Sequence, residues 1–305
     1  MAAISGDLAL KRGNSREALW FYVIACSISW VIWLPVLLEG LGFTHWLASY
    51  DPQWFYKFAY GRAVNNIDVL TIAGGLGPLT AAVWITWHYH GPAAVKRLFA
   101  RALPPRVAWY WYLIAFCIPL GYHSIAGLVE MAQGYPFPIG TPQTPGAVTM
   151  SAWAFFYSVA TMTVFIIVEE LGWRGVMQPA LQRHMSALKA ALIVGVAWAY
   201  WHLPFFINLN YVASGSLSDA VINTALAPMF TIPTTILLGW ILNSTSGSVF
   251  LCMLTHAVNN SAVRLFTHSE AAGQWVRIGA WLMAILVLLV FGARDLSRKP
   301  RYVPE

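Results

Sequence analysis

The stretch Thr163–Pro179, TVFIIVEELGWRGVMQP, places two adjacent acids directly after an uninterrupted apolar run. The acids are Glu169 and Glu170, and Arg174 follows the second one four residues later. An ionised side chain at membrane depth costs at least about 2.5–3.5 kcal/mol on insertion scales. Because the whole chain has only 12 acids in 305 residues, two of them at the end of such a run indicate a structural partner, a function, or both.

The composition around this stretch is that of a membrane protein. The chain is 58% hydrophobic and 15% aromatic, only 10% of its residues are charged, and its mean hydropathy is +0.60. A soluble domain is typically about a quarter charged. A chain this apolar cannot cover itself with a polar surface, so the composition predicts that its main solvent is the lipid bilayer.

Eight segments approach the roughly 20 apolar residues that a helix needs to cross a bilayer. The chain is therefore predicted to be an all-α polytopic membrane protein, with one transmembrane domain over residues 1–305 and a catalytic core at about 148–266. We interpret the first segment as an anchor, because no small-residue cleavage pattern follows it. The segments are 17–40, 67–89, 107–129, 148–170, 188–207, 219–243, 247–266 and 275–293.

The basic residues predict the orientation of these spans, because Lys and Arg collect in cytoplasmic loops. Both termini are expected to be cytoplasmic, which also explains the net charge of +6 without a nucleic-acid partner. The residues outside the cytoplasmic set are Lys57, Arg62, Arg264 and Arg277. The cytoplasmic set is Lys11, Arg12, Arg16, Lys96, Arg97, Arg101, Arg106, Arg174, Arg183, Lys189, Arg294, Arg298, Lys299 and Arg301.

The fourth and fifth spans are expected to form an antiparallel hairpin. The midpoint between Glu169 and His202 falls near residues 185–186, where a polar turn is plausible. About 16 helical residues rise roughly 24 Å, so both side chains are expected at a similar depth within the membrane and within reach of its cytoplasmic side.

Helical spacing separates the two acids of the opening stretch. Glu170 and Arg174 are four residues apart with the acid first, which favours an ion pair on one helix face. Glu169 points about 100° away from that face. We therefore predict that Glu170 and Arg174 neutralise each other and brace the helix, while Glu169 faces a cavity.

Two further polar pairs have the same spacing on neighbouring spans. Trp198 and His202 are four residues apart in the fifth span, and His256 and Asn260 are four residues apart in the seventh. A lone histidine inside a membrane is usually a packed, hydrogen-bonded residue. The coincidence of His202 and His256 with the two acids favours a catalytic role instead.

These motifs resemble those of the type II CAAX prenyl endopeptidases, also called the CPBP or Abi family of intramembrane proteases. The similarity extends over about 100 residues, and the span count is similar to the eight-helix core of that family. Trp198 stands where many members have Phe, which keeps an aromatic wall. The three motifs are Glu169-Glu170-x-x-x-Arg174, Trp198-x-x-x-His202 and His256-x-x-x-Asn260.

The resemblance implies an endopeptidase that cleaves membrane-associated proteins or peptides, prenylated CAAX-type proteins among them. Glu169 with His202 would activate a water molecule, and His256 with Asn260 would stabilise the oxyanion. Peptide hydrolysis needs this combination of a base and positioned donors. The resemblance implies supporting roles for Glu170 and Arg174.

The metal requirement is open at this point. The family is often described as metalloproteases, and Glu169, His202 and His256 are all residue types that ligate Zn²⁺. No His-Glu-x-x-His motif occurs in the sequence. We favour a site without a metal or other cofactor and keep zinc as the alternative.

Other interpretations of these residues are possible besides an enzyme. Trp198 and Trp201 are interpreted mainly as packing or interfacial residues, with substrate lining as a second reading. A carrier that uses Glu169 as a proton relay, or a scaffold that binds membrane partners, would also explain intramembrane polar groups. The expected partners are a membrane-embedded or lipidated substrate and the bilayer. The expected location is the plasma membrane of a bacterium, and the oligomeric state is not predicted.

Overall fold

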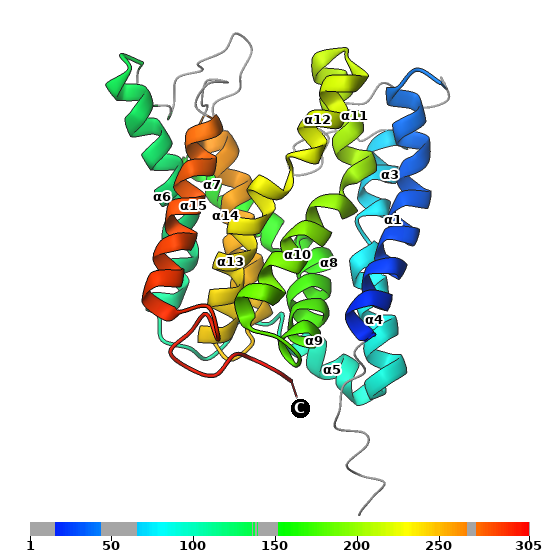
Figure 1. Cartoon of the computed structure of the whole chain (residues 1–305), viewed down its shortest axis with the longest axis vertical. Helices are drawn as coiled ribbons and strands as arrows, with labels where there is room; N and C mark the ends of the chain where they lie inside the picture. The colour runs from blue at the N-terminus through cyan, green and yellow to red at the C-terminus, as the bar shows by residue number, and fades with distance from the viewer. Residues whose placement is uncertain are drawn as a thin grey trace, which may run out of the picture.

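The computed structural model describes residues 16–43, 66–135, 137, 139, 152–266 and 273–304. Over these residues the chain forms a single bundle of helices that run roughly side by side (Figure 1). No strand occurs in the described part of the chain, where Ile139 and Phe266 form an isolated antiparallel bridge. The predicted all-α architecture is confirmed.

The helices are listed here with the labels of Figure 1. In chain order they are α1 (Glu17–Gly40), α3 (Asn66–Gly74), α4 (Gly77–His90), α5 (Pro92–Ala100), α6 (Tyr110–Ala132), α7 (Ala152–Phe165), α8 (Ile167–Gly172), the π-helical turn η1 (Trp173–Met177), α9 (Gln178–Gln182), α10 (Ala187–Trp201), α11 (Leu203–Ser214), α12 (Leu217–Ala225), α13 (Pro228–Ser244), α14 (Val249–Leu265) and α15 (Gly273–Phe291).

The described part of the chain contains six helical stretches that are long and apolar enough to cross a membrane, or seven if the bent pair α10–α11 is counted as one span. Each of the eight predicted segments coincides with one or more of these helices. The segment 247–266 corresponds to α14, whose apolar part is shorter than a full span. The protein is therefore an integral, multi-pass membrane protein.

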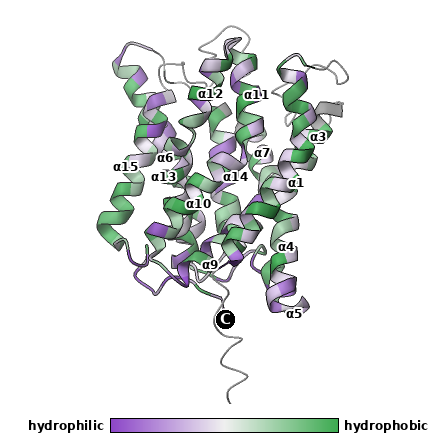
Figure 2. Ribbon diagram, turned by 45° about the vertical axis from the view of Figure 1, so that its right-hand side comes forward, coloured by the Kyte–Doolittle hydropathy of each residue, from purple (hydrophilic) through white to green (hydrophobic). Residues whose placement is uncertain are grey.

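Most spans are apolar around their whole circumference, as expected for helices that contact lipid on one side and other helices on the other. Figure 2 shows hydrophobic residues along the flanks of the bundle, and hydrophilic residues at α5 and in the C-terminal segment. Three helices begin with a serine that caps a backbone N–H group, which satisfies one of the free donors of the first turn. These serines are Ser186, Ser216 and Ser248.

The segments with most of the basic residues meet at one end of the bundle (Figure 1). Glu17 at the start of α1 accepts from Arg183 Nη1 at 2.8 Å and lies 3.3 Å from His90 Nε2 at the end of α4. The C-terminal segment reaches the same end, where Gln182 Nε2 donates to the carbonyl of Tyr302 at 2.8 Å. This clustering agrees with the predicted topology, and the cytoplasmic assignment of that end stays a prediction.

One basic residue of the predicted cytoplasmic set has a different place. Arg174 has no exposed surface and lies within the bundle, in the π-helical turn η1. The sequence places it in a cytoplasmic connection, because the predicted fourth span ends at residue 170. Arg174 is therefore an internal ion-pair partner and does not indicate the orientation of the spans.

The predicted hairpin of the fourth and fifth spans is present. α9 ends at Gln182 and α10 begins at Ala187, so the turn lies at residues 183–186. α10 then packs against α13 and contacts α1, α9 and η1. This arrangement brings Glu169 and His202 to the same region of the bundle.

The close contact between α1 and α4 depends on Gly77. A methyl group at this position would lie 2.6 Å from the carbonyl oxygen of Ala25 and would also collide with the side chain of Ser29. Ser29 Oγ donates to the carbonyl of Gly74 at 2.7 Å and accepts from Trp201 Nε1 at 2.7 Å. Gly77 therefore leaves room for a hydroxyl that joins α1, α3 and α10.

We predict that Gly77→Ala destabilises the bundle, because overpacking at a fixed backbone contact typically costs about 1–3 kcal/mol. The measurement is the thermal unfolding midpoint of the detergent-solubilised protein. Gly273→Ala is the matched control, since an added methyl there meets no described atom within 4 Å. Equal midpoints for the two variants would contradict this account of the helix contact.

Candidate active site

The two acids of the opening stretch lie in the first turn of a new helix. α7 ends at Phe165 and α8 begins at Ile167, so Glu169 and Glu170 lie near the N-terminus of α8. The helix then widens into the π-helical turn η1, a feature that is frequent at functional sites.

Glu170 is the centre of a buried charge cluster. Arg174 Nη1 donates to Glu170 Oε1 at 3.0 Å, and neither side chain has exposed surface. The ion pair expected from the sequence spacing is therefore present. His256 on α14 adds a second donor, because its Nδ1 lies 2.9 Å from the same oxygen. A carboxylate oxygen only accepts, so Nδ1 of His256 carries the proton.

Arg174 is held by three further contacts from other parts of the chain. Its Nη2 donates to Thr235 Oγ1 on α13 at 3.3 Å, and its guanidinium carbon lies 4.8 Å from the centre of the Trp198 ring. Its backbone carbonyl accepts from Arg101 Nη2 at 3.1 Å. The cluster therefore joins α8, η1, α10, α13 and α14, while Glu170 Oε2 and Arg174 Nε are buried without a hydrogen-bond partner among the described residues.

Glu169 has a different environment from its neighbour. It is partly exposed, while Glu170 is fully buried. Trp198 Nε1 donates to Glu169 Oε2 at 2.8 Å, and a hydrogen bond to an ionised carboxylate is among the stronger ones in proteins. The predicted division between an accessible acid and a bracing acid matches this difference in burial.

Trp198 also fixes the tautomer of the His202 ring. The Nδ1 atom of His202 lies 3.0 Å from the backbone carbonyl of Trp198. Because a carbonyl only accepts, Nδ1 carries the hydrogen, and Nε2 of the neutral ring keeps its lone pair. Trp198 thus contacts both predicted catalytic groups, Glu169 through its indole N–H and His202 through its carbonyl.

His202 lies at a break in the fifth span. α10 ends at Trp201 and α11 begins at Leu203, with a bend of 57° between them. Pro204 explains the bend, because proline lacks the N–H of the helix ladder and its ring clashes with the preceding turn. The sequence predicted one continuous span over 188–207. The bend gives His202 a position at the joint of two helices.

A cavity of about 200 Å³ brings three of the four predicted catalytic residues together. Glu169, His202 and Asn260 line it, and each is partly exposed. Asn259 Nδ2 donates to Asn260 Oδ1 at 3.1 Å, which leaves the amide N–H groups of Asn260 as donors. The rest of the wall is Trp33, Thr71, Ile72, Gly75, Met162, Phe165, Ile166, Val168, Trp201 and Phe205.

His256 has a different position from the other three. It is 4% exposed and, within the described part of the chain, it does not belong to the cavity wall. Its ring packs edge-to-face on Trp198, with ring centres 5.1 Å apart. His256 thus belongs to the buried cluster of Glu170 and Arg174.

The two tryptophans considered for substrate lining have separate positions. Trp201 lines the cavity and donates to Ser29 on α1, whereas Trp198 lies behind the wall and contacts Glu169, Arg174 and His256. The sequence analysis did not identify several residues that hold or line the site, because all of them except Asn259 come from segments distant from the three motifs. These residues are Ser29, Trp33, Arg101, Thr235 and Asn259.

The alternative zinc site requires Glu169, His202 and His256 to converge on one ion. His256 donates its Nδ1 proton to Glu170, and Trp198 donates to one oxygen of Glu169, so Nε2 of His256 and the other oxygen of Glu169 keep their lone pairs. Among the described residues, no group of three or more His, Cys, Asp or Glu side chains is close enough to hold a metal. The three side chains are therefore not gathered around one point in this structure, and the metal-free site stays a prediction.

Two comparisons show which known proteins this chain resembles. Residues 151–262 match the family model described as type II CAAX prenyl endopeptidase Rce1-like. A segment of 44 residues is 46% identical to CAAX prenyl protease 2 of Methanococcus maripaludis. That alignment covers 14% of this chain and spans only 16% of the length of the archaeal protein.

The matched region includes all the residues from Glu169 to Asn260 on which the resemblance was based. The resemblance predicted from the three motifs is thereby confirmed. Residues 151–262 are thus similar to the Rce1-like type II CAAX prenyl endopeptidases.

Proposed function

We propose that this protein is an intramembrane endopeptidase that hydrolyses peptide bonds of membrane-associated proteins or peptides. The observation that carries the proposal is the cavity in which Glu169, His202 and Asn260 are accessible together. A carboxylate, an imidazole with a free nitrogen and an amide donor provide a base and an oxyanion donor. The Rce1-like region supports the assignment to the hydrolases.

In the proposed reaction, a water molecule in the cavity attacks the carbonyl carbon of the scissile bond. The Glu169 carboxylate, which lines the same cavity as His202, takes the proton that the water releases. The same proton then passes to the leaving nitrogen as the C–N bond breaks. The products are a carboxylic acid and an amine, so one water molecule is consumed for each bond cleaved.

The oxyanion of the tetrahedral intermediate needs donors that are already in position. We assign this role to the amide of Asn260, whose oxygen is held by Asn259. His256 donates its Nδ1 proton to Glu170, so it supplies a second donor at Nε2 only as an imidazolium. We therefore propose that His256 acts mainly with Glu170 and Arg174, in positioning the site.

The proposed substrate class is a lipidated, membrane-associated peptide. A curated relative that matches 44 residues of this chain is named CAAX prenyl protease 2. The cavity wall contains Trp33, Trp201 and Phe205, and such aromatic surfaces suit an apolar substrate.

We predict that Glu169→Gln reduces kcat for a fluorogenic prenylated CAAX peptide by at least about 100-fold, the usual contribution of a general base. The purified variant should keep its thermal unfolding midpoint within a few degrees. Full activity of the variant would contradict the proposed mechanism. Wild-type activity that is lost with a chelator and restored by zinc would contradict the metal-free form of it.

Glu170→Gln is expected to lower the thermal stability of the protein. The substitution leaves Arg174 as an uncompensated charge at a site with no exposed surface, which typically costs about 3–5 kcal/mol. Thermal unfolding in detergent micelles should therefore show a much larger loss for Glu170→Gln than for Glu169→Gln. Similar midpoints for the two variants would refute the division of roles between the two acids.

Trp198→Phe tests the hydrogen bond to Glu169 separately from the packing of the ring. Phenylalanine keeps an aromatic face for Arg174 and an edge for His256 but has no N–H group. We expect kcat to fall about tenfold with KM nearly unchanged, which corresponds to roughly 1.4 kcal/mol of transition-state stabilisation. A change in KM alone would indicate a substrate-lining role instead.

A further inference from the structure

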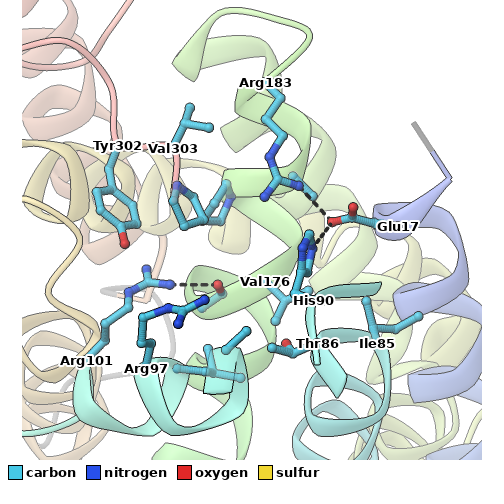
Figure 3. Close-up of a pocket in the computed structure, with 16 residues that line it drawn as sticks. Glu17, Ile85, Thr86, His90, Arg97, Arg101, Val176, Arg183, Tyr302 and Val303 are labelled. Atoms are coloured by element: carbon cyan, nitrogen blue, oxygen red, sulfur yellow. Dashed lines mark hydrogen bonds and ion pairs between the residues drawn. The ribbon is translucent and has the colours of Figure 1, made fainter. Parts of the chain in front are cut away.

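A second cavity, of about 650 Å³, lies at the end of the bundle where α1 begins and α4 ends. Its wall contains apolar side chains such as Ile85, Leu98 and Val176, together with several charged groups (Figure 3). It shares no lining residue with the cavity at Glu169. The charged and aromatic residues on its wall are Glu17, His90, Arg97, Arg101, Arg183 and Tyr302.

The charges on this wall do not balance. Among the described lining residues Glu17 is the one acid, against three arginines. Glu17 Oε2 accepts from Arg183 at 2.8 Å and also contacts His90 at 3.3 Å. This acid therefore compensates Arg183, and the charges of Arg97 and Arg101 are left over.

Arg101 is anchored by uncharged groups. It donates to the backbone carbonyls of Gly247 at 2.9 Å, Gly175 at 2.8 Å and Arg174 at 3.1 Å, and it lies over the Tyr302 ring. Burial lowers the pKa of Arg101, but a guanidinium stays protonated in proteins. Carbonyls satisfy three of its five N–H groups and leave its positive charge in place.

Arg97 precedes Arg101 by four residues and lies on the same side of the segment that begins with α5. It is exposed, and it makes no hydrogen bond or ion pair with a described residue. Figure 3 shows its guanidinium extending into the cavity beside that of Arg101. Like charges at this spacing repel each other, so an anion between them would relieve the repulsion.

The position of α5 would allow the cavity to bind a ligand located at the membrane surface. The helix follows directly on α4, which ends at His90, and therefore lies at the margin of the apolar spans. It exposes Phe99 on its surface next to the basic Lys96 and Arg97. Basic residues and exposed apolar side chains together are typical of helices that lie in the headgroup region.

We propose that this cavity is a binding site for a phosphate group, held by the guanidinium groups of Arg97 and Arg101. Arginine is suited to phosphate oxygens because its planar N–H groups bind them in pairs. Basic pockets between transmembrane helices take the headgroups of anionic lipids, and the apolar wall accommodates the adjoining glycerol and acyl carbons. The two sources of the phosphate are an anionic phospholipid of the adjacent leaflet and free phosphate.

Binding is tested on the full chain by native mass spectrometry after exchange into detergent with phosphatidylglycerol or phosphatidylcholine. We expect wild-type protein to retain phosphatidylglycerol preferentially, and Arg97→Gln to reduce this retention about tenfold. Lys96→Gln is the matched control, because it removes the same charge from the adjacent exposed position, which does not line the cavity. It should retain the lipid like wild type.

A second measurement separates the two sources. If free phosphate is the ligand, inorganic phosphate added to delipidated protein should raise the thermal unfolding midpoint. If the lipid headgroup is the ligand, the protein should retain phosphatidylglycerol, and inorganic phosphate should leave the midpoint unchanged. Either result, lost in Arg97→Gln and kept in Lys96→Gln, supports the site. Equal losses in the two variants, or no effect of lipid or phosphate on wild type, would overturn the proposal. Because neither readout uses peptide cleavage, failure of the proposed function would leave this test unaffected.

Discussion

The contact between Glu170 and Arg174 is the constraint on which the rest of the site depends. Both side chains are fully buried, so each charge is tolerable only while the other remains in place. Their spacing requires a helical turn, while His256, Thr235 and the Trp198 ring come from three other helices. A purely local ion pair thereby determines how α10, α13 and α14 pack around η1.

This buried cluster and the accessible residues have different tasks. The charged side chains of the cluster do not line the cavity. Glu169, His202 and Asn260 do line it, but each makes few contacts that fix its position. Trp198 connects the two groups, because its indole N–H and its carbonyl contact Glu169 and His202. The buried cluster thus holds the accessible reactive groups in fixed positions, and activation of a water molecule requires such pre-organisation.

The basic cavity and the buried ion pair are linked through the backbone of η1. Arg101 donates to the carbonyls of Arg174 and Gly175, and its guanidinium also lines the basic cavity. The side chain of Arg174 meanwhile holds Glu170. An anion that orders Arg101 would therefore stabilise the turn that carries the buried ion pair, without touching the cavity at Glu169.

The sequence by itself determined the membrane environment, the order of the helices and the pairing of Glu170 with Arg174. The membrane environment follows from composition, and the helices and the ion pair follow from helical periodicity, which relates residues only a few positions apart. Only the tertiary structure decided that His256 pairs with Glu170 and that Trp198 contacts both Glu169 and His202. The bend at His202 follows from Pro204, which the sequence already contains. Spans that are apolar around their circumference do not reveal in sequence how each helix is rotated toward its neighbours. That rotation assigned His256 to the buried cluster and left Asn260 in the cavity.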